Sequence, residues 1–164
     1  MKEPRVSRPY MPGYGMVGPD EGGGLLDWSW AEMKLRQSRE YWVASVWPDG
    51  RPHVMPVWGA WNQDAFWFSG SNRSRKVRNL KVNPGITVTT DDASNPVVVE
   101  GTAELITNRA LIAIFINRTN SKYNQSYGLE FLDPDVNATF RVFPKKVIGL
   151  QESNFTGSPT RWEF

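Results

Sequence analysis

The chain has 164 residues with 19 Lys or Arg, 17 Asp or Glu and no Cys, and its formal net charge is +2. This length fits one domain with its own core, and eight Trp, eight Phe and five Tyr make that core, or an interface, rich in aromatic rings. The absence of Cys excludes disulfides and thiolate sites, and a single His, His53, makes a His-based metal site or a Ser-His triad hard to build. Any catalysis is therefore expected to depend on a bound group that the side chains of the protein do not supply.

The charge and hydropathy of the chain indicate where the protein works. No stretch approaches the roughly 18 apolar residues that a membrane span needs, and the N-terminus has no apolar segment of signal-peptide type. We therefore expect a cytoplasmic protein without a membrane partner. A net charge of +2 is too small by itself to indicate nucleic-acid binding, so the charge pattern matters locally.

The N-terminal part of the chain contains an arm and a helix. Residues 1–24 are rich in Gly and Pro, as in "RPYMPGYGMVGPDEGGG", and cannot sustain a helix or a central strand. The apolar residues of this arm favour wrapping around a partner subunit, and a disordered tail is the alternative. The next segment, "DWSWAEMKLRQSR", predicts a helix over residues 27–39, with Ser29 and Glu32 spaced as a capping box.

Three segments rich in β-branched and aromatic residues follow the helix. They cover residues 41–47, 51–61 and 65–69 and are separated by the turns "PDG" and "NQD". Both faces of these strands carry apolar side chains, so the strands are covered on two sides or curl around a closed core. This pattern favours a barrel over an open sheet.

The second half of the chain mixes helices and strands. A short helix is expected over residues 73–83, and a longer helix begins near Thr107. Further strands are expected over residues 86–92, 95–106, 138–144 and 145–152. The chain therefore divides into an arm (1–24), one domain of the mainly β, α+β class (25–153) and a tail (154–164).

The segment "SGSNRSRKVRNLKVNP", residues 69–84, carries five Lys or Arg and no carboxylate. Small residues before a helix N-terminus leave backbone N–H groups free, and the helix dipole favours a negative charge there, so the segment suits a phosphate. The candidate phosphate ligands are Ser69, Ser74, Arg75 and Lys76. Two alternatives stay open: a solvated basic helix, and nucleic-acid binding, which ranks lower because base stacking needs exposed rings.

Three blocks resemble one known family in their order and spacing: "PDGRPHVMPVWGAW", "FWFSGSNRSRKVRNLKVNP" and "VVVEGTAEL". Over residues 41–105 the chain is similar to the pyridoxamine 5'-phosphate oxidase-like split β-barrel proteins, also called flavin/deazaflavin oxidoreductases. The resemblance implies a homodimeric split barrel with a flavin-type cofactor, FMN or coenzyme F-420, at the subunit interface. It also implies transfer of hydride or two electrons to or from a small conjugated organic molecule, with no nucleic acid as partner.

The resemblance also assigns cofactor contacts to residues of this chain. The strand that lines the isoalloxazine, largely through backbone groups, corresponds to His53, Val54, Met55, Pro56 and Val57. The phosphate is assigned to Ser69, Ser74, Arg75 and Lys76. No metal is expected, and no catalytic proton donor is assigned, because His53 fits a structural or backbone role as well as catalysis.

Three further residues are candidates for contacts with a substrate or a partner subunit. Trp58 follows the ring-lining segment and is a candidate wall for a planar substrate, with core or dimer packing as the alternative. Arg161 and Trp162, in the ending "TRWEF", are candidates for a lid over the cofactor of the partner subunit. An exposed, frayed chain end is the alternative for these two residues.

Two departures from the family pattern limit these expectations. True pyridoxamine 5'-phosphate oxidases use a late Arg-x-His motif for their substrate, and no His follows His53, so that named activity is not expected. Pro96 stands where a flavin-contacting Gln often precedes the "VVV" strand, which leaves the choice between FMN and coenzyme F-420 open. A non-catalytic flavin- or haem-binding split-barrel protein is the alternative function.

Overall fold

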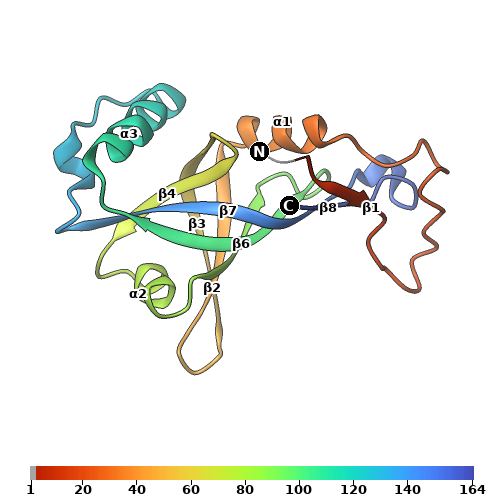
Figure 1. The fold of residues 1–164 in the computed structure, drawn as a ribbon, viewed down its shortest axis with the longest axis horizontal. Coiled ribbons are helices and arrows are strands. Elements are labelled where there is room, and N and C mark those ends of the chain that lie inside the picture. The colour runs from red at the N-terminus through yellow and green to blue at the C-terminus, as the bar shows by residue number, and fades with distance from the viewer. Residues whose placement is uncertain (1–2) are drawn as a thin grey trace.

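The computed structural model describes residues 3–164 and shows a mainly β protein with three α-helices (Figure 1). The strands are β1 (Arg5–Ser7), β2 (Glu40–Val46), β3 (Pro52–Asn62), β4 (Ala65–Ser71), β5 (Gly85–Thr90), β6 (Val97–Ile106), β7 (Asn137–Gly149) and β8 (Thr160–Glu163). The helices are α1 (Trp28–Gln37), α2 (Arg75–Val82) and α3 (Arg109–Tyr123). Two short 3₁₀ turns, η1 (Leu129–Leu132) and η2 (Glu152–Asn154), lie in the later loops.

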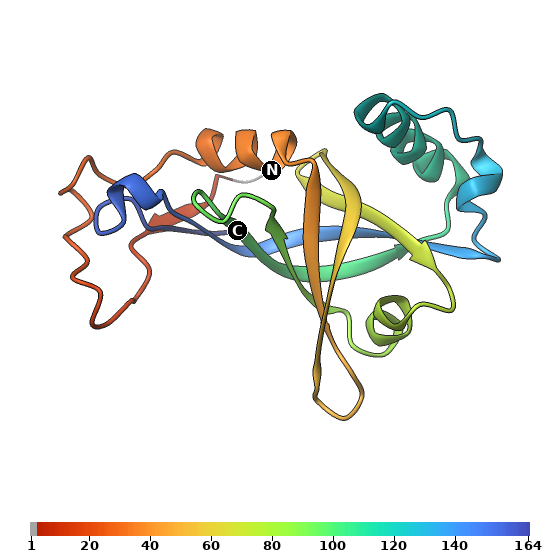
Figure 2. The same ribbon diagram turned by 180° about the vertical axis from the view of Figure 1, so that it is seen from behind.

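Six strands close into an antiparallel barrel. Their order is β7-β4-β3-β2-β5-β6, and β6 pairs back onto β7 along its whole length. The hairpin of β2 and β3 extends beyond the barrel and ends close to α2, while α3 lies at one end of the molecule (Figures 1 and 2). The mainly β barrel expected from the two-sided apolar strands is confirmed.

The turns of the meander are tight because their residues permit unusual backbone angles. Gln63 and Asp64 have φ values of 50° and 59°, the positive values that a two-residue hairpin turn of type I′ requires. Gly50, with a φ of 88°, closes the β2–β3 hairpin, where the Trp47 N–H donates to the carbonyl oxygen of Arg51 at 2.8 Å. These turns set the register that later places the site residues of β3 and β4.

The barrel interior is packed with aromatic rings, as the composition indicates. Phe66, Phe68 and Phe140 are fully buried. The ring centroid of Phe68 lies 5.7 Å from that of Phe66 and 5.4 Å from that of Phe140. A second apolar cluster, which includes Trp67 and Phe115, packs α3 against the outside of the barrel. Large buried rings of this kind dominate core energetics and hold α3 beside the strands that build the site.

Strand β7 corrects the prediction of two strands at 138–144 and 145–152. It runs without a break over residues 137–149 because β6 pairs with both halves. The register shifts at one point: Glu100 faces Lys146, while Gly101 faces Pro144. A bulge of this kind accommodates Pro144 inside the strand, whereas the sequence pattern indicated that a strand ends at this proline.

The predicted capping box at the start of α1 is also wrong. Asp27 is the N-cap, and Ser29 therefore lies inside the first turn. The Glu32 carboxylate instead accepts hydrogen bonds from Trp61 Nε1 at 3.3 Å and from the Arg36 guanidinium at 2.7 Å. Tertiary contacts of Glu32 with β3 thus replace the local contact that the spacing predicted.

The arm and the tail meet on the side of the barrel away from α3. β1 pairs with β8, and β8 extends the sheet from β7 (Figure 1). The Arg8 guanidinium donates to the carbonyl oxygens of Gly157 and Pro159 at 2.7 and 2.8 Å. Arm residues therefore contact their own chain, and wrapping around a partner subunit stays a prediction. Within residues 3–164, no helix is long and apolar enough to cross a membrane.

Candidate functional site

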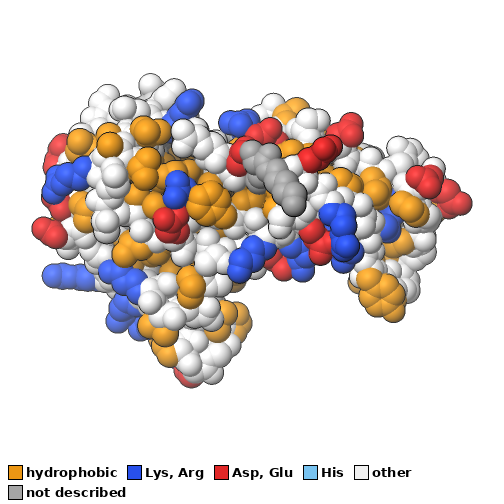
Figure 3. Space-filling view, viewed as in Figure 1, with side chains coloured by type: hydrophobic (Ala, Val, Ile, Leu, Met, Phe, Trp, Pro, Cys, Tyr) orange, Lys and Arg blue, Asp and Glu red, His pale blue; other side chains and the backbone are white. Residues whose placement is uncertain are grey.

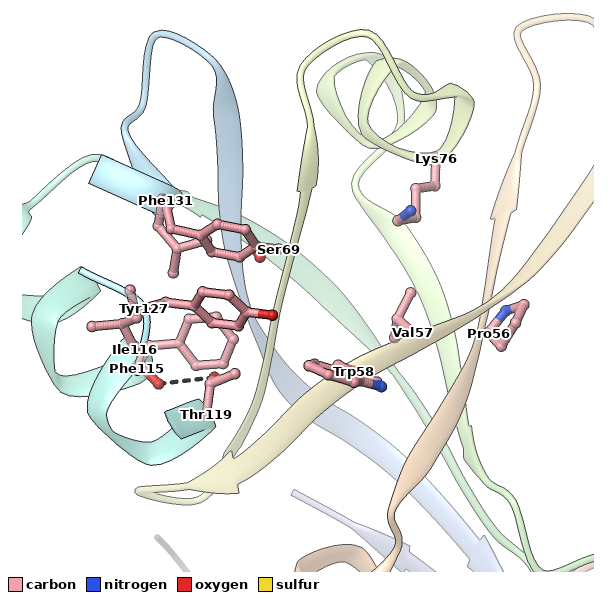
Figure 4. Close-up of a pocket in the computed structure, with 11 residues that line it drawn as sticks. Pro56, Val57, Trp58, Ser69, Lys76, Phe115, Ile116, Thr119, Tyr127 and Phe131 are labelled. Atoms are coloured by element: carbon pink, nitrogen blue, oxygen red, sulfur yellow. Dashed lines mark hydrogen bonds between the residues drawn. The ribbon is translucent and has the colours of Figure 1, made fainter. Parts of the chain in front are cut away.

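A cavity of about 270 Å³ lies between the barrel and α3 (Figure 4). Its lining comes from β3, β4, the start of α2, α3, η1 and the segment between α3 and η1. The lining residues are Pro56, Val57, Trp58, Ser69, Lys76, Phe115, Ile116, Thr119, Tyr127, Phe131 and Leu132. The cavity thus joins two predicted phosphate ligands, Ser69 and Lys76, with Pro56 and Val57 of the predicted ring-lining segment and with Trp58, the predicted substrate wall.

The polar end of the cavity is formed by β4 and the first turn of α2. Gly70 follows Ser69 on β4, and a Cβ atom at this position would lie only 3.0 Å from Lys76 Cε and 3.4 Å from Lys76 Nζ. The missing side chain therefore lets Lys76 lie against the strand. Figure 4 shows the Lys76 ammonium directed from α2 toward Ser69 and Val57.

Polar atoms at this end lack the partners that buried polar atoms normally have. Ser74 is the N-cap of α2, yet its hydroxyl makes no capping hydrogen bond. Ser74 Oγ and Arg75 Nε are both buried with no hydrogen-bond partner among residues 3–164. Within the same residues, no hydrogen bond or ion pair involves Lys76 Nζ, and burial lowers the pKa of Lys76. A bound anion would supply the missing partners of all three groups.

Arg75 is positioned by the tip of the β2–β3 hairpin. Its Cζ atom lies 3.7 Å from the centroid of the Trp47 ring, and Arg51 Cζ lies 4.4 Å from the same centroid. Asp49 holds Arg51 in place by accepting from its Nε atom at 2.9 Å. Desolvation, followed by the charges of Arg78 and Arg51, lowers the pKa of Arg75.

The surface over α2 is positively charged. Figure 3 shows Lys and Arg side chains gathered at this end of the molecule, below the barrel. Arg78 and Lys81 belong to this surface but are not among the residues that line the cavity. Clustered cations raise the local concentration of anionic ligands, so this surface supports an anion site at the start of α2.

The opposite end of the cavity is aromatic. Trp58 stacks on Tyr123 with ring centroids 4.3 Å apart, and Tyr127 stacks on Phe131 with centroids 4.1 Å apart. Asn120 on α3 anchors Tyr127: its Nδ2 donates to the Tyr127 carbonyl oxygen at 2.9 Å, and its Oδ1 accepts from the Tyr127 N–H at 3.0 Å. The two hydrogen bonds define the position of Tyr127 relative to α3.

Hydrogen bonds from the C-terminal end of α3 attach it to the barrel. Lys122 Nζ donates to the Tyr41 hydroxyl and to the Gly59 carbonyl oxygen, both at 2.9 Å. The Tyr123 hydroxyl donates to the Arg39 carbonyl oxygen at 2.5 Å and accepts from the Gly59 N–H at 2.9 Å. Burial lowers the pKa of Lys122 to about 8, and it raises the pKa of Tyr123 to about 12.

Several predicted cofactor residues lie on the protruding part of β3. Val54 and Met55 are 50% and 44% exposed, and His53 faces the edge of the Trp47 ring with centroids 6.4 Å apart. Trp42, on the neighbouring strand β2, is 45% exposed as well. Trp42 and Val54 project from the same face of the hairpin, because Trp42 pairs with Pro56, two positions along β3 from Val54. An exposed apolar face of this kind is typical of a surface that another molecule covers.

The two predicted lid residues lie on β8. Trp162 is fully buried in the barrel core, with its ring centroid 5.7 Å from that of Trp28. The lid prediction is therefore wrong for Trp162, and so is the alternative of a frayed end, because pairing with β7 directs this ring into the core. Arg161 donates from Nε to the Ser7 hydroxyl at 3.1 Å, and its role over a partner subunit stays a prediction.

The sequence analysis missed the α3 side of the cavity. Phe115 and Thr119 lie on α3, whose apolar residues predicted only packing, and Tyr127 and Phe131 lie in the segment that follows this helix. These residues reach the cavity because α3 folds back beside β3 and β4, which is a tertiary relationship. No local pattern signals it.

A closed antiparallel barrel with a polar corner at α2 defines a split-barrel protein of the class that the resemblance implied. Sequence comparison then identifies the family. The profile described as pyridoxamine 5'-phosphate oxidase matches residues 31–152, and the chain belongs to this family. No curated protein sequence matches the chain.

Solved structures share this fold at low sequence identity. An F-420 reductase has a TM-score of 0.59 at 24% identity, covering 71% of this chain and 94% of that chain. A conserved hypothetical protein from Mycobacterium tuberculosis has a TM-score of 0.67 at 17% identity, covering 84% and 85%. A haem storage protein from Vibrio cholerae has a TM-score of 0.58 at 19% identity, covering 71% and 86%. At such identities the likeness concerns the fold alone.

Proposed function

We propose that the protein is an oxidoreductase that binds FMN or coenzyme F-420 and transfers two electrons to or from a small conjugated organic molecule. The observation that carries this proposal is the corner at the start of α2, where Ser74 Oγ and Arg75 Nε are buried without partners among residues 3–164. A phosphate oxygen accepts hydrogen bonds from both groups, and charge-assisted bonds of this kind are strong. Both candidate cofactors carry such a phosphate.

The proposed cofactor site divides between two elements. Ser69, Ser74, Arg75 and Lys76 would hold the phosphate, and the strand segment from His53 to Val57 would line the ring through its backbone. A flavin-type ring brings its own hydride chemistry, so the chain needs only to bind, orient and tune it. This division agrees with a sequence that has one His and no Cys.

We propose further that the cofactor lies between two copies of the chain. Trp42, Val54 and Trp58 are large apolar side chains, between 41% and 50% exposed, on one face of the hairpin that carries the ring-lining segment. Covering this apolar face with a second subunit would stabilise a homodimer and enclose the ring. A dimer would fit the cofactor proposal, because one subunit alone leaves this strand open to water.

The alternative is a non-catalytic protein that binds a flavin or haem. It is favoured by one observation, the shared fold of the haem storage protein from Vibrio cholerae. The two functions differ in turnover. In a storage or sensing protein, the bound reduced cofactor would react with every electron acceptor no faster than the free reduced cofactor does in solution.

The cofactor proposal is tested by recording the visible spectrum of the purified protein and titrating FMN and coenzyme F-420 separately. We expect one of them to bind, and Lys76→Met to weaken its binding by roughly tenfold through loss of a charged hydrogen bond. Lys81→Met is the matched control, because Lys81 Nζ bonds Asn72 and lies outside the cavity. Failure of both cofactors to bind, or equal effects of the two substitutions, would contradict the proposal.

A further inference from the structure

We infer that the Lys122 amine reacts reversibly with carbon dioxide and forms a carbamate. The inference does not depend on the cofactor, because Lys122 is not among the residues that line the cavity proposed for it. It assigns a modification site to the junction of α1, β3 and α3, on the side of the barrel where both helices lie (Figure 1). Another cavity, of about 230 Å³, lies at this junction and is lined by Arg36, Ala60, Trp61, Arg118, Ser121 and Lys122.

The hydrogen bonds of Lys122 are compatible with a neutral amine. An ammonium group has three N–H groups, and Lys122 Nζ donates two of them, to the Tyr41 hydroxyl and to the Gly59 carbonyl oxygen. Within residues 3–164, no other hydrogen bond and no ion pair involves this atom. Loss of the third proton therefore keeps both hydrogen bonds and leaves a lone pair at the position that has no partner. Burial raises the pKa values of Tyr41 and Tyr123, so these neighbouring hydroxyls stay neutral.

The groups around Lys122 favour the neutral amine near pH 8. Burial lowers the pKa of Lys122 to about 8, the charges of Asp91 and Glu40 oppose this shift, and the charge of Arg39 adds to it. Arg39 also pairs with Glu40 at 3.2 Å, which weakens the effect of that carboxylate. About half of the Lys122 amines are then neutral at pH 8, and a desolvated lysine of this kind is a nucleophile.

Carbon dioxide matches the access and the chemistry of this amine. It is small and uncharged, so it reaches a half-buried nitrogen more readily than a bulky acyl donor does. The nitrogen lone pair attacks the carbon, a C–N bond forms as one C–O π bond becomes an oxygen lone pair, and one amine proton passes to water. The nitrogen keeps one N–H, which remains available to the Gly59 carbonyl oxygen, and the product carries one negative charge.

The cavity beside Lys122 is suited to this anionic product. Arg118, one turn before Lys122 on α3, has no hydrogen-bond or ion-pair partner within the described part of the chain. Arg36 supplies a second guanidinium from α1, and Glu32 pairs with it at 2.7 Å. Guanidinium groups bind carboxylates through charge-assisted hydrogen bonds, and a carbamate presents the same pair of oxygens. We therefore expect Arg118 to stabilise the carbamate.

The inference is tested by trapping the carbamate. The protein is incubated with ¹³C-labelled bicarbonate, alkylated with a trialkyloxonium reagent and mapped by peptide mass spectrometry. We expect label at Lys122 and at least roughly tenfold less at Lys34, a matched control because Asp92 pairs with it at 3.2 Å and its side chain is only 25% exposed. Arg118→Gln should reduce the label at Lys122 by roughly two- to fivefold, the effect of one exposed ion pair. Arg109→Gln, at the start of α3, should leave it unchanged.

The pH dependence of the label gives an independent test. At constant dissolved carbon dioxide, the label at Lys122 should rise between pH 6.5 and pH 8.5 as the amine loses its proton, and Lys122→Arg should abolish it, because a guanidinium keeps its proton. No label at Lys122 over this range, equal label at Lys34, or equal effects of Arg118→Gln and Arg109→Gln would overturn the inference. The mapping of the unmodified protein does not depend on how a variant folds. None of these measurements involves FMN or coenzyme F-420, so their failure would leave the proposed function untouched.

Discussion

The guanidinium carbon of Arg75 lies 3.7 Å from the centre of the Trp47 ring, so a cation of α2 rests on the tip of the β2–β3 hairpin. The two residues come from elements that are separate in sequence. The same ring also contacts Arg51. Two guanidinium groups on one indole repel each other, and an anion between or beside them would relieve this repulsion. The contact therefore links the hairpin to the proposed phosphate site.

Trp47→Leu should weaken cofactor binding by removing the surface that orients Arg75. We expect an increase of roughly two- to fivefold in the dissociation constant, the size of an exposed cation–π contact. Fluorescence titration with FMN or coenzyme F-420 measures the change. Trp47→Phe retains an aromatic face and should restore most of the affinity. Identical dissociation constants for the Leu variant and the unmodified protein would show that Trp47 has no part in the site.

Gly70→Ala should weaken cofactor binding with little change in stability. The new Cβ would lie 3.0 Å from Lys76 Cε and 3.3 Å from Val77 Cγ2, so the flexible end of Lys76 must move away from the strand. Displacement of an ammonium by even a small distance weakens a charged hydrogen bond. Titration and thermal melting measure the two effects. Gly18→Ala is the control, because its Cβ would make only an ordinary contact of 3.6 Å with Glu21.

Cofactor affinity should fall as the pH rises through the alkaline range. Burial lowers the pKa of Lys76 in the free protein, so this side chain loses its proton at a lower pH than an ordinary lysine. The phosphate binds the protonated ammonium, and the dissociation constant therefore increases as deprotonation proceeds. Titrations across a pH series measure the slope. Lys76→Met should flatten it, and an equal slope in that variant would assign the pH dependence to another group.

Local pattern predicted the parts of the fold that local chemistry determines. The meander of β2, β3 and β4 and the basic helix α2 follow from β-branched runs, turn residues and the Asn83-Pro84 stop. The candidate phosphate ligands could be predicted from the sequence because they lie within eight positions of one another, from Ser69 to Lys76. A glycine and three serines directly before a basic helix indicate an anion site from the local sequence alone.

Other parts of the molecule depend on contacts between distant segments. Pro144 indicated the end of a strand, yet pairing with β6 across a bulge keeps β7 continuous. Trp162 lies near the chain end, where exposure is common, but the barrel core gains more from burying this large ring. Tyr127 is placed at the site by its two hydrogen bonds with Asn120 and by its stack on Phe131. Such relationships leave no periodic signal in the sequence.

Gly59→Ala should destabilise the barrel. A Cβ at this position would overlap the Phe66 ring and would lie 2.7 Å from the Trp67 carbonyl oxygen, at the point where β3 pairs with β4. Overpacking of a filled core typically costs about 1–3 kcal/mol, and the backbone groups of Gly59 also hold Lys122 and Tyr123. Chemical denaturation measures the loss. A midpoint equal to that of the unmodified protein would contradict the tight packing described here.

The stability of the protein should increase between pH 8 and pH 10 because of Lys122. Burial lowers the pKa of this lysine from 10.5 to about 8, so in this range the unfolded chain binds more protons than the folded protein. The free energy of unfolding therefore rises with pH, by on the order of 1 kcal/mol once solvent screening of a half-buried group is counted. Above pH 10 the sign reverses, because burial raises the pKa values of Tyr41 and Tyr123 and only the unfolded chain then loses their protons. Urea denaturation at a series of pH values measures the slope. Lys122→Met should reduce the rise below pH 10, whereas Lys81→Met should leave it unchanged, and a slope that survives in the Lys122 variant would assign it to other groups.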